Sequence, residues 1–154
     1  MIRIILVLAT LIIISCNNEK VKREQMFGEW NNLSIRVDIE TKMNTDSNEV
    51  LTVEQAEWEQ RLKIKPIRTY LRADSTWNSA HYNLNDSLIY NPSGKWWIDN
   101  DSLIMVQTFP SIDTSSYLIK LSKDTASFTS RLDWDMDGKK DDLYVGRQFK
   151  VNKP

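Results

Sequence analysis

Cysteine, histidine and glycine are scarce in this chain of 154 residues, which contains one Cys, one His and four Gly. A lone cysteine, Cys16, supports neither a disulfide framework nor a thiolate metal site. Four glycines leave no glycine-rich loop that could cradle a phosphate. The only histidine, His81, has no serine near it in a nucleophile-elbow context. The chain therefore lacks a catalytic signature, and we expect a non-catalytic protein without catalytic residues.

An excess of basic charge is also missing. Without residues 1–15, in which Arg3 is the only charged residue, 139 residues remain, with 19 Lys and Arg against 21 Asp and Glu. A nucleic-acid binder would present a basic face, so we expect no nucleic-acid partner. The remaining length suits one domain with a real core. Six Trp, five Tyr and four Phe can supply that core.

The chain begins with an apolar run that is too short to span a bilayer. The run covers residues 4–14 after the basic Arg3, whereas a spanning helix needs about 20 apolar residues. A basic start, a short apolar stretch and a small residue before the cleavage point are typical of a secretory signal peptide. We therefore interpret residues 1–15 as a signal peptide and the protein as exported. A membrane-anchor helix is the alternative.

The end of this run, Ile13-Ile14-Ser15-Cys16, resembles the lipobox of bacterial lipoproteins. The resemblance implies that Cys16 carries diacylglycerol, becomes the first residue after cleavage and is acylated on its amine. Several acyl chains, at about 0.8 kcal/mol per buried CH₂, anchor a protein stably without a spanning helix. Asn17 stands where inner-membrane lipoproteins favour Asp, which favours the outer membrane, at its periplasmic face or the cell surface. We interpret residues 16–26 as a lipid-anchored tether.

The rest of the chain alternates apolar and polar residues in short segments separated by turn residues, as antiparallel strands do. One helix is expected at 52–64, where Thr52 and Gln55 form a capping-box pattern and Pro66 ends the segment. Residues 41–49 are expected to be a polar loop. The predicted strands cover residues 33–39, 67–73, 76–84, 87–90, 95–99, 103–108, 117–121, 126–134 and 143–151.

About nine antiparallel strands would leave open edges unless the sheet closes on itself. We therefore predict an all-β fold with one short helix, in which an antiparallel meander closes into a small β-barrel. The last strand ends close to the C-terminus and is free to pair with the first. A barrel of eight strands has room for packed side chains or for one small ligand. A two-sheet sandwich is the alternative.

A Gly-x-Trp sequence, Gly28-Glu29-Trp30, precedes the first predicted strand. Polar turns and short strands then recur, as in Asp74-Ser75-Thr76-Trp77, Ser93-Gly94-Lys95-Trp96-Trp97-Ile98 and Asp101-Ser102-Leu103. Over residues 27–151 this arrangement resembles small bacterial lipocalin-like lipoproteins. The resemblance implies a lipocalin-like barrel domain in which Trp30 plugs one end. It also implies a module that binds a small apolar molecule or a cell-envelope component.

Four tryptophans are the candidate ligand-binding residues: Trp30, Trp77, Trp96 and Trp97. Trp96 and Trp97 are adjacent on one predicted strand, so their rings face opposite sides of the sheet. We expect one of the two rings in the core and the other on the surface, where it can contact a partner. Packing of all these rings in the barrel is the alternative.

Within residues 133–142, the first nine residues, 133–141, match the first nine positions of a calcium loop of the EF-hand type. Asp133, Asp135, Asp137 and Asp141 occupy positions 1, 3, 5 and 9, and Gly138 occupies position 6. These four aspartates are the candidate calcium ligands. Position 12, however, is Tyr144 instead of Glu, and strands flank the segment. A hairpin with solvated carboxylates is the alternative.

Three functions remain open at this point. The first is a lipid-anchored envelope lipoprotein whose domain binds an apolar ligand or an envelope component. The second is an accessory outer-membrane lipoprotein that acts through surface contacts with proteins, for example through the basic stretch at 61–68. The third is an envelope hydrolase that uses paired carboxylates or His81.

Overall fold

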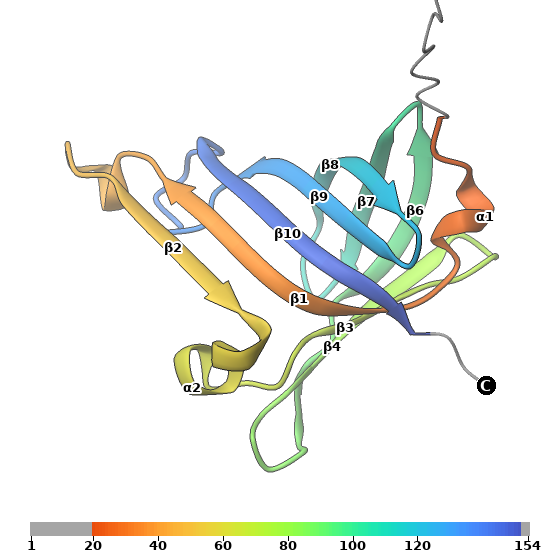
Figure 1. The fold of residues 1–154 in the computed structure, drawn as a ribbon. Coiled ribbons are helices and arrows are strands. Elements are labelled where there is room, and N and C mark those ends of the chain that lie inside the picture. Colours follow the sequence, from red (N-terminus) through yellow and green to blue (C-terminus); the bar gives the residue numbers. More distant parts are fainter. Residues whose placement is uncertain (1–19, 152–154) are drawn as a thin grey trace, which may run out of the picture.

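The computed structural model describes residues 20–151, which form a closed antiparallel β-barrel (Figure 1). Eight strands make the barrel wall, and the last pairs with the first along Glu29–Asp38. The predicted closed meander is confirmed, and the sandwich is excluded. Residues 1–19, including the predicted signal peptide and Cys16, lie outside the described residues. In order around the wall, the strands are β1 (Gly28–Ile39), β3 (Arg68–Leu71), β4 (Thr76–Tyr82), β6 (Ser93–Asp99), β7 (Ser102–Phe109), β8 (Asp113–Ser122), β9 (Thr125–Leu132) and β10 (Asp142–Val151).

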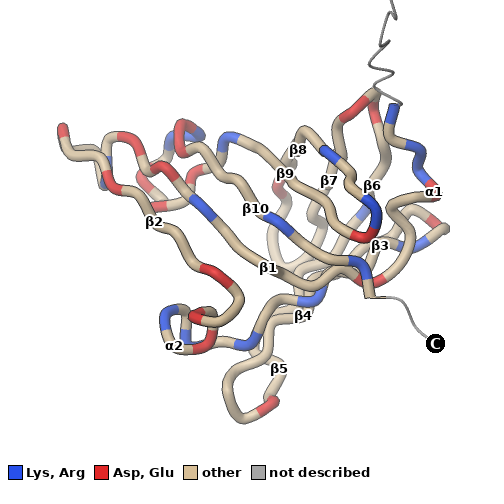
Figure 2. The backbone as a smooth tube through the Cα atoms, in the orientation of Figure 1, with Lys and Arg blue, Asp and Glu red and all other residues tan. Residues whose placement is uncertain are grey.

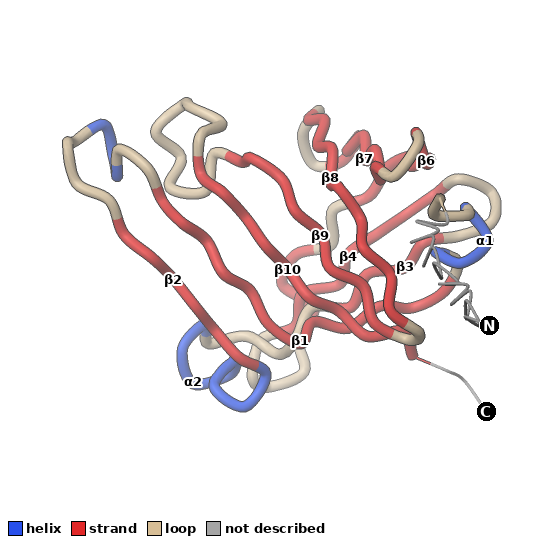
Figure 3. Tube along the Cα trace, turned by 45° about the horizontal axis from the view of Figure 1, so that its top comes forward, coloured by secondary structure: helices blue, strands red, loops and turns tan. Residues whose placement is uncertain are grey.

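The strand β1 has three neighbours because it is longer than the barrel wall. Its first residues pair with β3, its later residues pair with β2 (Glu49–Glu54), and its other edge pairs with β10. Figure 3 shows β2, β1, β10 and β9 side by side, with β2 at the outside. A second short strand, β5 (Leu88–Tyr90), pairs with β4 alone.

A bulge in β1 reverses the side on which its residues are buried. The register with β10 shifts between Asn32 and Ser34, and a shift of one residue moves side chains to the opposite face. The buried alternation therefore runs through Trp30 and Asn32 before the shift and through Ile35, Val37 and Ile39 after it. The predicted alternation of Leu33 with Ile35 is wrong for Leu33, which precedes the change.

The closed end of the barrel is formed by the start of β1, the 72–75 and 100–101 turns and helix α1 (Arg23–Met26). Its core contains Met26, Trp30, Leu71, Trp77, Trp96, Leu103, Ile119, Ala126 and Phe128. Trp30 Nε1 donates to Met26 O at 2.8 Å, so the ring holds α1 across the end. Trp30 thus lies in the core of the closed end, against α1. Met26 is fully buried, so α1 packs on the barrel although it lies in the segment predicted as a tether.

The side of the barrel where β1 leaves β3 is covered by the β2–α2 segment. Val53 of β2 and Trp58 of helix α2 (Trp58–Leu62) pack on Ile35 in a second core. The helix predicted over 52–64 is therefore shorter, and Thr52 lies in β2 instead. Residues 49–54 form a strand instead of a helix because Val53 alternates with exposed neighbours and is buried against β1. Short 3₁₀ turns occupy Lys42–Asn44 (η1) and Gln55–Glu57 (η2). Within residues 20–151, no helix is long and apolar enough to cross a membrane.

Candidate functional site

A cavity of about 270 Å³ lies inside the barrel and opens at the end opposite α1. We call this the open end; it includes the end of β4, the 110–112 turn and the 133–141 connection. Strands from all around the barrel contribute to the wall, so the cavity is the barrel interior rather than a surface groove. Its lining residues are Asn32, Ile67, Thr69, Leu71, Trp77, Ser79, His81, Pro92, Leu103, Met105, Gln107, Tyr117, Phe128, Leu132, Trp134, Tyr144 and Gln148.

The cavity lining carries no Asp, Glu, Lys or Arg among the described residues. Two of its hydroxyl groups satisfy each other, since Thr69 Oγ1 and Ser79 Oγ lie 2.8 Å apart. By contrast, Asn32 is buried and its Oδ1 has no hydrogen-bond partner in the protein. A buried carbonyl oxygen without a donor is costly. The cavity wall therefore carries no formal charge, and Asn32 contributes a side-chain amide to it.

Aromatic rings form one side of this wall. Tyr117 meets Phe128 and Tyr144 edge to face, with ring centroids 6.4 and 6.1 Å apart. Burial raises the pKa of the Tyr117 and Tyr144 phenols, so both stay protonated near neutral pH. Glycine at position 146 is required here, because a Cβ atom would lie 2.1 Å from Tyr144 Oη.

The four candidate tryptophans lie in three different environments. Trp77 lines the cavity, and its Nε1 donates to Val106 O at 3.3 Å. Trp30 and Trp96 are buried in the core at the closed end and do not line the cavity. Trp97 is 44% exposed on the outside of β6. The adjacent pair, Trp96 and Trp97, thus divides between core and surface as β-strand geometry requires.

Trp134 is a cavity residue that the sequence analysis did not select. Its ring stacks on Tyr144, with centroids 6.0 Å apart and planes at 22°. The alternation of Leu132 and Trp134, which runs past the end of β9, was the available signal, because it points both side chains to the same face. The calcium-loop pattern in the same segment indicated the aspartates on either side of Trp134, and not its ring.

His81 lies at the open end of the cavity without a catalytic partner. Its ring packs edge-on against Tyr90, with centroids 5.1 Å apart. Among the described residues, no carboxylate and no serine hydroxyl hydrogen-bonds to His81. Burial lowers the pKa of His81, which favours the neutral imidazole. The geometry therefore suits a polar wall residue of the cavity.

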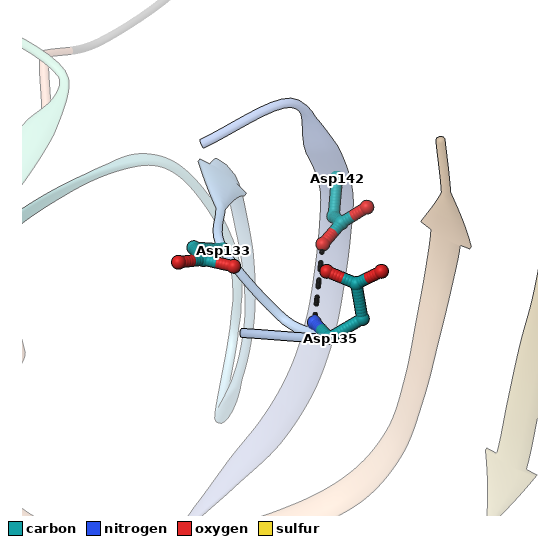
Figure 4. Close-up of side chains that lie close together, drawn as sticks. All are labelled: Asp133, Asp135 and Asp142. Atoms are coloured by element: carbon teal, nitrogen blue, oxygen red, sulfur yellow. Dashed lines mark hydrogen bonds between the residues drawn. The ribbon is translucent and has the colours of Figure 1, made fainter. Parts of the chain in front are cut away.

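The acidic loop, residues 133–142, lies beside the β1–β2 connection (Figure 2), to which Thr41 and Asn44 bond it. Side-chain oxygens of Asp133, Asp135 and Asp142 lie within 4.8 Å of one another (Figure 4). Asp142 is fully buried; its Oδ1 accepts from Glu40 N at 2.9 Å and its Oδ2 from Trp134 N at 2.7 Å. The register of β10 thus brings Asp142 into the cluster, where the sequence pattern had placed Asp141.

The other two predicted ligands, Asp137 and Asp141, are in the same loop but outside this group of three. Asp137 Oδ1 accepts from Lys139 N at 2.9 Å, and Asp141 Oδ2 accepts from Thr41 Oγ1 at 3.2 Å. Asp133 Oδ2 accepts from Gly138 N at 3.1 Å, which folds the loop back on itself. All four predicted aspartates therefore have one oxygen in a loop hydrogen bond or in the cluster.

A scan against models of known protein families finds no match to this chain, and a search of curated proteins finds no relative.

Proposed function

We propose that this protein is an exported lipoprotein, anchored through Cys16, whose barrel binds a small, uncharged and mostly apolar ligand. The observation that carries this proposal is the barrel cavity with its uncharged lining, in which Asn32 supplies a side-chain amide. Ligand pockets typically combine an apolar wall with a few polar groups that orient the ligand. The side-chain amide of Asn32 would hydrogen-bond a polar group of the ligand and so orient it.

The size of the cavity limits the ligand. Its volume of about 270 Å³ is just below the range of about 300–1,000 Å³ for pockets that hold drug-sized molecules. A compact ring system fits this space better than a long extended chain. An ionised group would lose its hydration in the cavity without gaining a counter-charge, so the buried part of the ligand is neutral.

An anchor at Cys16 would orient the barrel relative to the membrane. At the closed end, Val21 N donates to Asp101 Oδ1 at 3.4 Å, and Arg23 Nη2 donates to Ala73 O at 2.7 Å. From Val21 to Cys16 is five residues, which reach at most about 18 Å when fully extended. A lipid on Cys16 would therefore hold the closed end near the membrane and turn the cavity opening away from it. Ligand exchange would then take place on the aqueous side.

The test uses N-phenyl-1-naphthylamine, an uncharged aromatic probe with a single N–H donor. Because the barrel closes within residues 20–151, the chain from Asn17 onward is the protein to study. We expect probe fluorescence to rise on binding, and a screen of neutral envelope-derived molecules can then be read as probe displacement. The variant Asn32→Leu should weaken probe binding about tenfold, the cost of one good hydrogen bond.

The matched control is Gln60→Leu, which removes a side-chain amide from the exposed surface of α2. Equal affinity of both variants for the probe would show that Asn32 does not contribute to the binding site. Absence of saturable probe binding by the unmodified domain would count against the carrier function as a whole.

Exposed apolar side chains favour the second candidate function, an accessory role through protein contacts. Ile89, Phe109 and Ile112 are exposed near the open end, on β5 and around the 110–112 turn. Large exposed apolar groups often mark interaction surfaces. If the domain binds no neutral probe, crosslinking in cells from position 112, compared with position 123 in the closed-end turn, would test this role.

A further inference from the structure

We propose that the acidic loop binds one calcium ion and that this ion fixes Trp134 in the wall of the cavity. The proposed site is separate from the apolar ligand site and would stand if the barrel carried no ligand. Its ligands are Asp133 and Asp135, whose oxygens converge beside Asp142, and Asp137, whose buried Oδ2 has no hydrogen-bond donor and would join them. Asp142, with both oxygens hydrogen-bonded, holds the loop in place.

Three unpaired carboxylate oxygens in the loop support the binding of a cation there. Asp133 Oδ1, Asp137 Oδ2 and Asp141 Oδ1 are all buried and have no hydrogen-bond donor in the protein. The whole Asp137 side chain is only 1% exposed. Burying a carboxylate oxygen without a donor or a counter-ion is costly, and a single loop seldom carries three such atoms.

The basic side chains around the loop do not compensate for these oxygens. Lys139 Nζ lies 3.9 Å from Asp137 Oδ2, beyond hydrogen-bond distance. Lys140 pairs with Asp113 of β8 at 2.9 Å. Arg131 donates to the backbone oxygen of Asp141 and lies 3.5 Å from Glu40. A cation inside the loop would neutralise the buried carboxylate oxygens that these three basic side chains leave unpaired.

The chemistry of the donors selects calcium. Every candidate side-chain ligand is a carboxylate, and hard oxygen ligands in a flexible arrangement suit Ca²⁺, which accepts six to eight of them. The spacing of Asp133, Asp135, Asp137 and Gly138 places Lys139 where calcium loops contribute a backbone carbonyl. Mg²⁺ demands near-octahedral geometry and retains water, so a folded loop of this kind favours the larger ion.

The ion would act on the cavity through Trp134, which lies between two of the proposed ligands. Trp134 N donates to Asp142 Oδ2, and its ring stacks on Tyr144 in the cavity wall. Asp135 N also points to Asp142 Oδ2, at 3.4 Å. An ion that gathers Asp133 and Asp135 therefore immobilises the backbone on both sides of this ring.

The test begins with the domain stripped of metal by a chelator and titrated with Tb³⁺, a luminescent substitute for Ca²⁺. We expect Tb³⁺ emission on excitation of tryptophan, because Trp134 lies within the loop, and we expect added Ca²⁺ to abolish it. Calorimetry should give a Ca²⁺ dissociation constant between about 10⁻⁶ and 10⁻³ M, the range of sensor and extracellular sites. Mg²⁺ at the same concentration should compete poorly.

Two substitutions locate the site. Asp137→Asn should weaken Ca²⁺ binding by about tenfold or more, as loss of a charged ligand does. The matched control, Asp124→Asn, makes the same charge change in the exposed β8–β9 turn at the closed end and should leave binding unchanged. Trp134→Phe should keep Ca²⁺ binding while it removes most of the sensitised Tb³⁺ emission.

Some results would overturn the proposal. One is the absence of a Ca²⁺ heat signal at about 10 mM, well above the range of natural sites. Another is an equal effect of Asp137→Asn and Asp124→Asn. Binding of the naphthylamine probe is measured separately, with and without chelator, so failure of the calcium site and failure of the carrier function are distinguishable.

Discussion

The two ends of this barrel are built in opposite ways. At the closed end, Trp30 and Trp96 are buried with both indole N–H groups bonded, to Met26 O and Arg72 O. At the open end, Asn32 and three loop aspartates have buried oxygens without donors.

This contrast separates the closed end, which supports the fold, from the open end, which carries the candidate site. Satisfied polar groups and close packing agree with the fold at every level, as expected of a stabilising core. Buried polar groups without partners cost free energy, and they often mark functional sites. The difference predicts that equal substitutions at the two ends will have unequal effects.

The largest expected effect is the loss of a closed-end tryptophan. Trp96→Ala should lower the free energy of unfolding by about 3–5 kcal/mol, since it removes a fully buried ring and leaves a cavity. The same change at Trp134, which is only partly buried beside the cavity, should cost less than half as much. Urea unfolding followed by far-UV circular dichroism measures both. Similar losses at the two positions would refute the contrast.

The second prediction concerns Asp142, a buried side chain of the acidic loop with both carboxylate oxygens hydrogen-bonded. Asp142→Ala leaves Glu40 N and Trp134 N without their acceptor. In the presence of chelator, it should cost about 2–3 kcal/mol, because charged hydrogen bonds are lost inside the protein. Asp124→Ala, at an exposed turn, should change the free energy of unfolding by less than about 0.5 kcal/mol. An equally mild effect at Asp142 would mean that its bonds are not structural.

The third prediction has the opposite sign. Asn32→Leu replaces a buried oxygen that lacks a donor with an apolar group of similar size. It should raise the free energy of unfolding by about 1 kcal/mol while it weakens ligand binding, a trade typical of functional positions. Thermal unfolding without ligand provides the measurement. A destabilised Asn32→Leu domain would show that the amide has an unrecognised structural role.

Local pattern was enough to predict the barrel, because strand alternation and turn residues are local signals. It failed where a non-local contact decides the outcome. Residues 49–54 form β2 because Val53 packs on Ile35, although Thr52 and Gln55 match a helix start. The bulge at Asn32 and Ser34 depends on pairing with β10 and reverses the buried face of β1.

The candidate site was predicted less well, for the same reason. Its cavity is lined by side chains from distant strands, and only register shows that Asn32, Trp77 and Tyr144 share it. The acidic loop was visible as a pattern. The β9–β10 register, in which Asp142 pairs with Leu132, determines that Asp142 joins Asp133 and Asp135.

The smallest expected effect concerns pH. Burial lowers the pKa of His81 below its usual value of about 6.5, so the unfolded chain binds a proton before the folded one does. Stability from the neutral imidazole is present above about pH 6.5 and is lost as the pH falls through the folded pKa. His81→Gln, which preserves polarity but does not titrate, should flatten this part of the pH profile of stability.

Because Asp74 and Asp113 have lowered pKa values, their contributions to stability are lost only in more acidic solution. The difference between the two proteins from pH 7 to 5 therefore isolates His81 at the open end, and identical profiles would show that its ring is hydrated like a surface histidine.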